Sequence, residues 1–301
     1  MIGATGVIGT SAVRALAAAG HDVVGLARTP EKAARLELAG ARAVQTDLFD
    51  PDGLARMFDG ADAVCNLTTH VPVGYGAARA GAWRENDRLR TEGVRRVVDA
   101  ARTAGVRRIV QESVSFLYAD NADGWITEQS PVEINRATEP ASVGESRIQD
   151  YACRSRSGVV LRFGTIVGDD RLTRWTLRSA RHGRPVGLGR PGTWAHVVHT
   201  DDLGPAVVAA LTAPSGIYNV GAEPVRRGSL VQGYADAVGQ DSGDFLGPVL
   251  RRLAGSRIEP LTRSLRVSSE HFTAQTGWTP RRATFDASWF DVIDMESKAV
   301  R

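Results

Sequence analysis

The sequence predicts an α/β protein: a Rossmann fold with a doubly wound parallel sheet, followed by a smaller C-terminal portion. Two observations support this. The chain opens on glycines with the spacing G-x-x-G-x-x-G, from Gly3 to Gly9, and helical and strand patterns then alternate over the first half. Alternating helices and strands build parallel sheets because the crossovers between parallel strands are right-handed. A chain of 301 residues suits one large domain or a nucleotide domain with a smaller partner.

The expected elements follow in a regular order. A helix with apolar residues at Val13, Leu16 and Ala17 comes after the glycines. Thr29-Pro30 and Asp50-Pro51 each combine an N-cap residue with a proline in the first helical turn. Strands are expected at 23–27, 43–44, 63–67, 108–111 and 159–162, with further helices over about 83–104 and 142–154.

We place the boundary between the two portions near Gly168. Residues 1–168 are expected to form the Rossmann domain, and residues 169–301 a substrate-binding portion partly interleaved with the sheet, since 216–220 has the pattern of another strand. Only Met1 and Ile2 precede Gly3, where a Rossmann fold has its central strand. A sheet without that strand would expose unpaired backbone, so the natural chain is expected to begin upstream of Met1.

Composition excludes several functional classes. The net charge is +3 and the arginines are scattered, so no nucleic-acid partner is expected. No apolar run approaches the roughly 18 residues of a membrane span, and no signal peptide is visible. The two cysteines, Cys65 and Cys153, are expected to be reduced in a cytoplasmic protein. No metal site is predicted.

The glycine spacing predicts a dinucleotide site. Such a site needs a tight turn, a close approach of backbone N–H groups to a pyrophosphate, and tight packing of the following helix on the sheet. The residues expected to contact the cofactor here are Gly3, Thr5, Gly6, Val7, Ile8 and Gly9.

On these residues the chain resembles the extended short-chain dehydrogenase/reductase family, the NAD-dependent epimerase/dehydratase-like superfamily. The matching segments are Gly3–Gly9, Asp47-Leu48, Leu161–Gly164, His199–Asp202 and Thr276–Pro280. The resemblance implies that Asp47 and Leu48 hold the adenine and that Leu67, Thr68 and Thr69 pass the cofactor ribose. It also implies cofactor contacts by Arg147 and Phe163, and a structural, helix-capping role for His199–Asp202.

The residue after the strand expected at 23–27 indicates NADP(H). NAD enzymes place Asp or Glu about 20 residues after the glycines to hold the ribose 2′-hydroxyl. This chain has Ala27-Arg28-Thr29 there, without an acid. The Arg28 guanidinium can meet a 2′-phosphate in a forked, charge-assisted contact. The alternative is an ordinary surface arginine.

The catalytic pair of the family is missing. Its reductases and epimerases use Tyr-x-x-x-Lys on the helix after the fifth strand, and the matching stretch here has Val143 and Arg147 in those two places. The only lysines are Lys32 and Lys298, and neither has a tyrosine four residues before it. General acid catalysis contributes about 10²–10⁴ in rate, whereas positioning contributes about 7–11 kcal/mol. Carbonyl reduction therefore remains feasible without the tyrosine.

Ser113 and Ser115 are the candidates for polarising a carbonyl, and local turn capping is the alternative for both. The proton could come from water, from either serine, from His70 or His196, or from a phenol of the substrate. Trp83 and Trp194 are the aromatic residues expected to contact the substrate, together with His70 and His196, although ordinary packing is the alternative for tryptophans.

The chain as a whole resembles atypical reductases that tailor aromatic polyketides, the angucyclinone ketoreductases among them. The expected function is therefore an NADPH-dependent reduction of a large aromatic ketone. The rival is a non-catalytic NADP(H) sensor of the NmrA type. The expected partners are a small-molecule substrate and, with the oligomeric state left open, a second copy of the chain in a homodimer.

Overall fold

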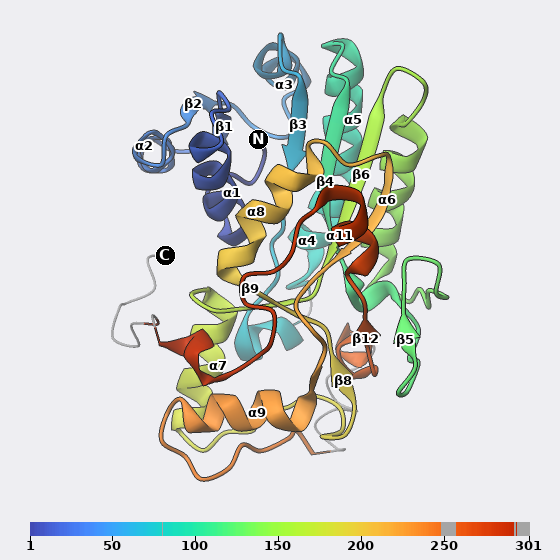
Figure 1. Ribbon diagram of the computed structural model, residues 1–301. Helices are drawn as coiled ribbons and strands as arrows, with labels where there is room; N and C mark the ends of the chain where they lie inside the picture. Colours follow the sequence, from blue (N-terminus) through green and yellow to red (C-terminus); the bar gives the residue numbers. More distant parts are fainter. Residues whose placement is uncertain (80, 248–256, 292, 294–301) are drawn as a thin grey trace.

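The computed structural model describes residues 1–79, 81–247, 257–291 and 293. Its centre is a parallel sheet with the order β2, β1, Met1–Ile2, β3, β4, β6, β10 (Figure 1). The predicted α/β Rossmann-like fold with a parallel sheet is confirmed. The strands are β1 (Val24–Ala27), β2 (Arg42–Gln45), β3 (Ala63–Asn66), β4 (Arg108–Val114), β6 (Ser157–Phe163) and β10 (Gly216–Val220).

Met1 and Ile2 join the two parts of this sheet. The Met1 amine donates to the Val24 carbonyl (2.6 Å), and the Leu26 N–H donates to the Met1 carbonyl (3.0 Å). On the other side, the Ile2 N–H donates to Cys65 O (2.9 Å) and the Ile2 carbonyl accepts from Leu67 N (3.0 Å). These two residues thus lie at the central position of the sheet, between β1 and β3.

Helices cover both faces of the sheet. On one face lie α1 (Val7–Ala18), α2 (Pro30–Leu38), α8 (Thr200–Ala210) and α11 (Glu270–Thr276). On the other lie α3 (Pro51–Phe58), α5 (Val94–Thr103) and α6 (Glu139–Tyr151). Thr29 and Asp50 cap α2 and α3 as predicted, each accepting a bond from a first-turn N–H. None of the helices in the described part of the chain is long and apolar enough to cross a membrane.

The helix predicted over 83–104 has three parts. α4 (Arg84–Arg88) continues into a π-helical turn, η2 (Leu89–Gly93), and then into α5. Single π-helical turns inside α-helices often occur at functional sites. Here the turn carries Arg90, which is only 6% exposed.

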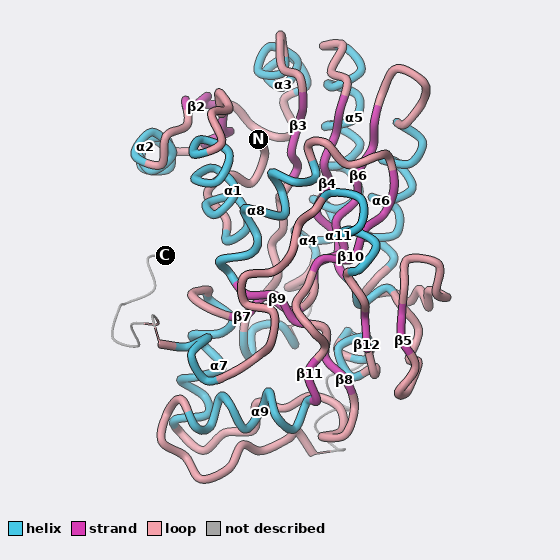
Figure 2. The backbone as a smooth tube through the Cα atoms, in the orientation of Figure 1, coloured by secondary structure: helices cyan, strands magenta, loops and turns pink. Residues whose placement is uncertain are grey.

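The remaining elements lie mainly below the sheet (Figure 2). They include α7 (Arg171–Arg181), α9 (Arg227–Asp236), β7 (Thr165–Val167), β8 (Trp194–Ala195), β9 (Val197–His199), β11 (Val225–Arg226), and the 3-10 turns η1 (Gly74–Ala78) and η6 (Ala287–Phe290). The pair β5 (Trp125–Ile126) and β12 (Arg266–Val267), with the turns η3 (Ser115–Leu117) and η5 (Glu259–Thr262), lies beside the carboxyl end of β4. The boundary at residue 168 stays a prediction.

The His199–Asp202 segment has a structural role. The His199 ring accepts from Asp201 N and caps α8 (3.2 Å). The fully buried Asp202 carboxylate accepts from the N–H groups of Arg281 (2.7 Å) and Arg282 (3.1 Å), and so holds the segment that follows Trp278.

Candidate active site

The glycine loop packs directly on the end of β3. Gly3 has φ +73°, and a Cβ there would lie 2.6 Å from the Leu67 carbonyl oxygen. A Cβ at Gly9 would lie 2.0 Å from the Gly3 oxygen. α1 begins without a side-chain cap, and both Gly6 and Val7 are exposed at its first turn. The uncapped N–H groups of this turn suit an anionic group such as a pyrophosphate.

Several buried side-chain polar atoms have no hydrogen-bond partner among the described residues, and three of them belong to residues predicted to bind the cofactor or polarise a carbonyl near the carboxyl ends of the strands. They are Thr68 Oγ1 after β3, Ser115 Oγ after β4, and Arg147 Nε on α6. Buried polar atoms in folded proteins are nearly always paired. In parallel α/β sheets, ligands bind outside these strand ends. The three atoms and the glycine loop therefore fit a bound dinucleotide.

Arg28 stands exposed directly after β1 and has no hydrogen bond or ion pair to the described residues. Burial lowers the pKa of nearby Lys32, and the positive charges of Arg28 and Arg35 lower it further. Arg28, Lys32 and Arg35 thus place positive charge between the end of β1 and α2, together with the carboxylate of Glu31, and the Arg28 guanidinium can form charge-assisted bonds with a phosphate.

The other residues predicted to bind the cofactor lie at the same sheet edge. The exposed Asp47 carboxylate accepts from Phe49 N (2.8 Å), and Leu48 is buried against Gly93 of the π-helical turn. Thr69 is half-buried. Phe163 is 2% exposed and packs in the core that also holds Leu67. All of these cofactor assignments stay predictions.

The two candidate serines differ in their hydrogen bonds. Ser113 Oγ donates to Glu145 Oε1 on α6 (2.5 Å), and the same carboxylate accepts two bonds from Arg162 on β6 (2.9 and 2.6 Å). Because a hydroxyl has a single proton, Ser113 has none left for a substrate oxygen. Ser115 is fully buried, its Oγ has no partner, and it remains free to donate.

A second buried ion pair lies beside the first. Arg90 Nη2 donates to Glu112 Oε1 (2.9 Å), and both side chains are almost completely buried. Burial raises the pKa of Glu112, and the charge of Glu145 raises it further, while Arg90 acts in the opposite direction. A further buried hydrogen bond lies at the end of β3, where Asn66 Nδ2 donates to Gln111 Oε1 (2.8 Å).

The residues predicted to contact the substrate are separated. Exposed His70 and half-buried Trp83 lie near α4: His70 N donates to Asn86 Oδ1 (3.2 Å), and Trp83 Nε1 donates to Ala77 O (2.9 Å). Trp194 is placed on β8, where the guanidinium groups of Arg226 and Arg266 lie 3.9 Å and 4.8 Å from the centre of its ring.

His196 lies in the interior of the protein. It is 1% exposed, and neither of its ring nitrogens has a partner. A Cβ at Gly221 would come within 2.0 Å of its Nε2. Burial lowers its pKa to about 3, so the ring is neutral near pH 7.

The sequence reasoning missed Glu145, Arg162, Arg90 and Glu112. One signal could have found two of them. Glu112 directly follows the strand predicted at 108–111, and Arg162 is the last residue of the strand predicted at 159–162. A charged residue in a buried strand is rarely stable unless it is paired, so these two positions required partners of opposite charge.

Comparisons with known proteins give a family match, a related reductase and similar folds. Residues 3–150 match the family model described as NAD(P)H-binding. A 3-diazoavenalumate denitrifying reductase from Streptomyces sp is 28% identical, over 98% of each chain. The fold is similar to that of MoeE5 in complex with UDP-glucose and NAD, with a TM-score of 0.74 and 23% sequence identity over 93% of this chain and 92% of that chain. It is also similar to that of the dTDP-glucose 4,6-dehydratase DesIV from Streptomyces venezuelae with NAD bound, with a TM-score of 0.75 and 22% identity over 93% of this chain and 91% of that chain.

The two serines should respond oppositely to removal of the hydroxyl. Ser113→Ala should lower the free energy of unfolding by about 1.5–3 kcal/mol, because Glu145 loses a hydrogen bond to a buried charge. Ser115→Ala should leave it unchanged or raise it, because it removes an unpaired buried hydroxyl. Urea unfolding of the ligand-free protein measures both. Equal losses in the two variants would contradict the assigned hydrogen bonds.

Proposed function

We propose that the protein is an NADPH-dependent reductase that transfers hydride to a carbonyl of a large aromatic substrate without a tyrosine acid. One observation carries this proposal: the buried hydroxyl of Ser115 has no protein partner, while Val143 and Arg147 stand where the family has its tyrosine and lysine. The close packing of the glycine loop on the end of β3 supports it. The match to an NAD(P)H-binding family and the similarity to a reductase support it.

Each part of the site has a distinct role. The loop Gly3–Gly9 and the first turn of α1 hold the pyrophosphate. Arg28 binds the 2′-phosphate, and Thr68 and Arg147 bind the ribose hydroxyls near the nicotinamide. When bound, NADPH supplies the hydride. Ser115 donates a hydrogen bond to the substrate carbonyl oxygen and so polarises it, and Ser113 stays bound to Glu145.

We assign the proton for the product alkoxide to the substrate or to solvent. Ser113 is committed to Glu145, and His196 is neutral and buried. A phenol beside the ketone carries a proton that already points at the oxygen. This internal donor replaces the missing tyrosine, whose general acid role is worth about 10²–10⁴ in rate.

A second candidate function follows from the similarity to the denitrifying reductase. Its name states that it acts on a diazo compound. Replacing the dinitrogen group of an aryl diazonium ion by hydride releases N₂, forms one C–H bond and consumes no proton. A site without an acid is compatible with that reaction, and the missing Tyr/Lys pair therefore favours it as the alternative.

The choice of cofactor can be tested at Arg28. If its guanidinium binds the 2′-phosphate, NADPH should bind about 10–150-fold tighter than NADH, because charge-assisted bonds contribute about 1.5–3 kcal/mol. Arg28→Ala should remove most of that preference, whereas Arg56→Ala, at an exposed position on α3, should keep it. Fluorescence titration with both cofactors measures it, and equal affinities in the parent protein would refute the assignment.

Substrate assistance can be tested with a tetralone that carries a hydroxyl peri to its ketone. We expect NADPH to reduce peri-hydroxytetralone about 10²–10⁴ times faster than its methyl ether, because only the phenol has a proton to give. Single-turnover rates at saturating ketone measure the difference. Equal rates for the two compounds would exclude an internal donor, and NADPH binding without oxidation by any aromatic ketone would favour the sensor.

An aryl diazonium salt distinguishes the two reductive reactions. If the protein is a denitrifying reductase, ortho-hydroxybenzenediazonium should give phenol and N₂ with one NADPH consumed, while peri-hydroxytetralone should not react. Ser115→Ala should slow ketone reduction about 10²–10³-fold and leave the diazonium reaction nearly unchanged, because no oxyanion forms in the latter. Product analysis with a protein-free control separates the enzymatic reaction from spontaneous reduction.

A further inference from the structure

We infer that Arg263, held by Glu259, is a positioning residue that fixes the two chain segments on which the candidate active site is built. One segment is η3, which begins with Ser115. The other is the loop that leads into α6, the helix that carries Val143 and Arg147. This inference rests on the proposed function and adds the residue that sets the geometry of its site.

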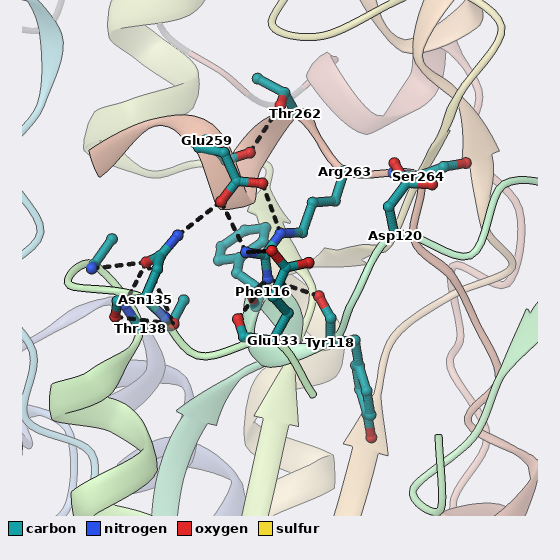
Figure 3. A network of polar contacts seen from close by, with 11 residues as sticks. Phe116, Tyr118, Asp120, Glu133, Asn135, Thr138, Glu259, Thr262, Arg263 and Ser264 are labelled. Atoms are coloured by element: carbon teal, nitrogen blue, oxygen red, sulfur yellow. Dashed lines mark hydrogen bonds and ion pairs between the residues drawn. The ribbon is translucent and has the colours of Figure 1, made fainter. Parts of the chain in front are cut away.

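Arg263 is 2% exposed and binds three backbone carbonyls at once (Figure 3). Its Nη1 donates to Tyr118 O (2.9 Å), Glu133 O (2.8 Å) and, over a longer distance, Phe116 O (3.4 Å). Phe116 and Tyr118 immediately follow Ser115. Glu133 belongs to the segment ahead of α6. A single guanidinium therefore holds together two loops that leave different elements of the fold.

Glu259 completes this set of contacts. We call Arg263, Glu259 and the three backbone carbonyls together the clamp. Its carboxylate accepts from Arg263 Nε (2.9 Å) and Nη2 (2.7 Å), a forked contact that fixes the plane of the guanidinium. Its Oε2 also accepts from Asn135 Nδ2 (2.7 Å). Asn135 Oδ1 in turn accepts from Ala137 N (2.8 Å), in the turn before α6. The clamp thus reaches the start of α6 through its side chains as well as through the Glu133 carbonyl.

The backbone around Arg263 is bonded to the loop that follows Tyr118 and to Arg227 of α9. Ser264 N donates to Asp120 Oδ2 (2.8 Å), and Ser264 Oγ donates to Ala122 O (2.5 Å). Arg227 Nη2 donates to Arg263 O (2.6 Å). Arg263 therefore extends from a fixed backbone. Its side chain adds to two backbone hydrogen bonds that join the same two segments, from Glu133 N to Leu117 O (2.8 Å) and from Ala119 N to Pro131 O (3.1 Å).

Lysine cannot replace this arginine. The guanidinium directs its donors in one plane to Glu259 on one side and to the carbonyls on the other, whereas an ammonium is a point charge on a flexible stem. Glu259→Gln is milder, because the amide oxygen still accepts one bond and the three carbonyl contacts remain. Glu133→Gln is the matched control, since the Glu133 carboxylate is 61% exposed and lies 3.7 Å from Arg263, while its backbone oxygen makes the contact.

Three measurements on the full chain test this role. In Arg263→Lys, the Tyr118, Ala119 and Glu133 amides should exchange about tenfold faster, because each bonds within the clamped loops, while the Leu26 amide in the sheet stays protected. The NADPH dissociation constant should stay within about twofold. The single-turnover rate with peri-hydroxytetralone should fall about 10–100-fold, since small displacements of a catalytic group cost that much. Glu259→Gln should show smaller changes, and Glu133→Gln none.

A lower melting temperature with unchanged hydride transfer in both Arg263→Lys and Glu259→Gln would overturn the positioning role and leave a structural one. Unchanged exchange of the three loop amides in Arg263→Lys would overturn the clamp itself. If the parent protein reduces no ketone, the proposed function is refuted. Amide hydrogen exchange of Tyr118 in the presence of NADPH then still tests whether Arg263 holds the two segments. NADPH should then protect the Tyr118 amide in the parent and not in Arg263→Lys, and equal protection in both would refute the inference.

Discussion

The buried ion pair between Glu145 and Arg162 is the interaction on which the candidate active site depends. A buried carboxylate costs several kcal/mol unless a charged partner and hydrogen bonds compensate it. Arg162 on β6 and Ser113 on β4 provide both, and they bind Glu145 of α6 across the helix–sheet boundary. α6 can therefore occupy only one depth and rotation on the sheet. The hydroxyl of Ser113 is committed, and Ser115 remains as the free donor.

The fold could be predicted where its causes are local. An N-cap side chain and a proline in the first turn act within four residues, and α2 and α3 begin at Pro30 and Pro51 as the sequence indicated. The central strand shows the limit of this reasoning. A pattern of two residues cannot reveal that Met1 and Ile2 bond to β1 on one side and to β3 on the other, because that pairing depends on segments more than twenty residues away.

The same division holds for the candidate active site. The glycine loop was predictable because its spacing specifies its own turn, and the structure packs Gly3 on Leu67 with no room for a Cβ. The choice between Ser113 and Ser115 was not predictable, because it depends on a carboxylate 32 residues further along the chain. Arg263 lies still farther from the loops it clamps, and nothing in its neighbouring residues distinguishes it from the other arginines.

The π-helical turn at Leu89–Gly93 fixes the number of residues in its helix. A π turn holds one residue more than the α-helical turn it replaces, and an α-helix rotates about 100° per residue. Losing that residue would restore a regular helix but turn its two ends relative to each other. Either Asn86 would leave the backbone of His70, or Val94 and Val97 would leave the core. Descendants of this chain can therefore lengthen or shorten their surface loops, while any change of length in this helix has to be accompanied by a second one.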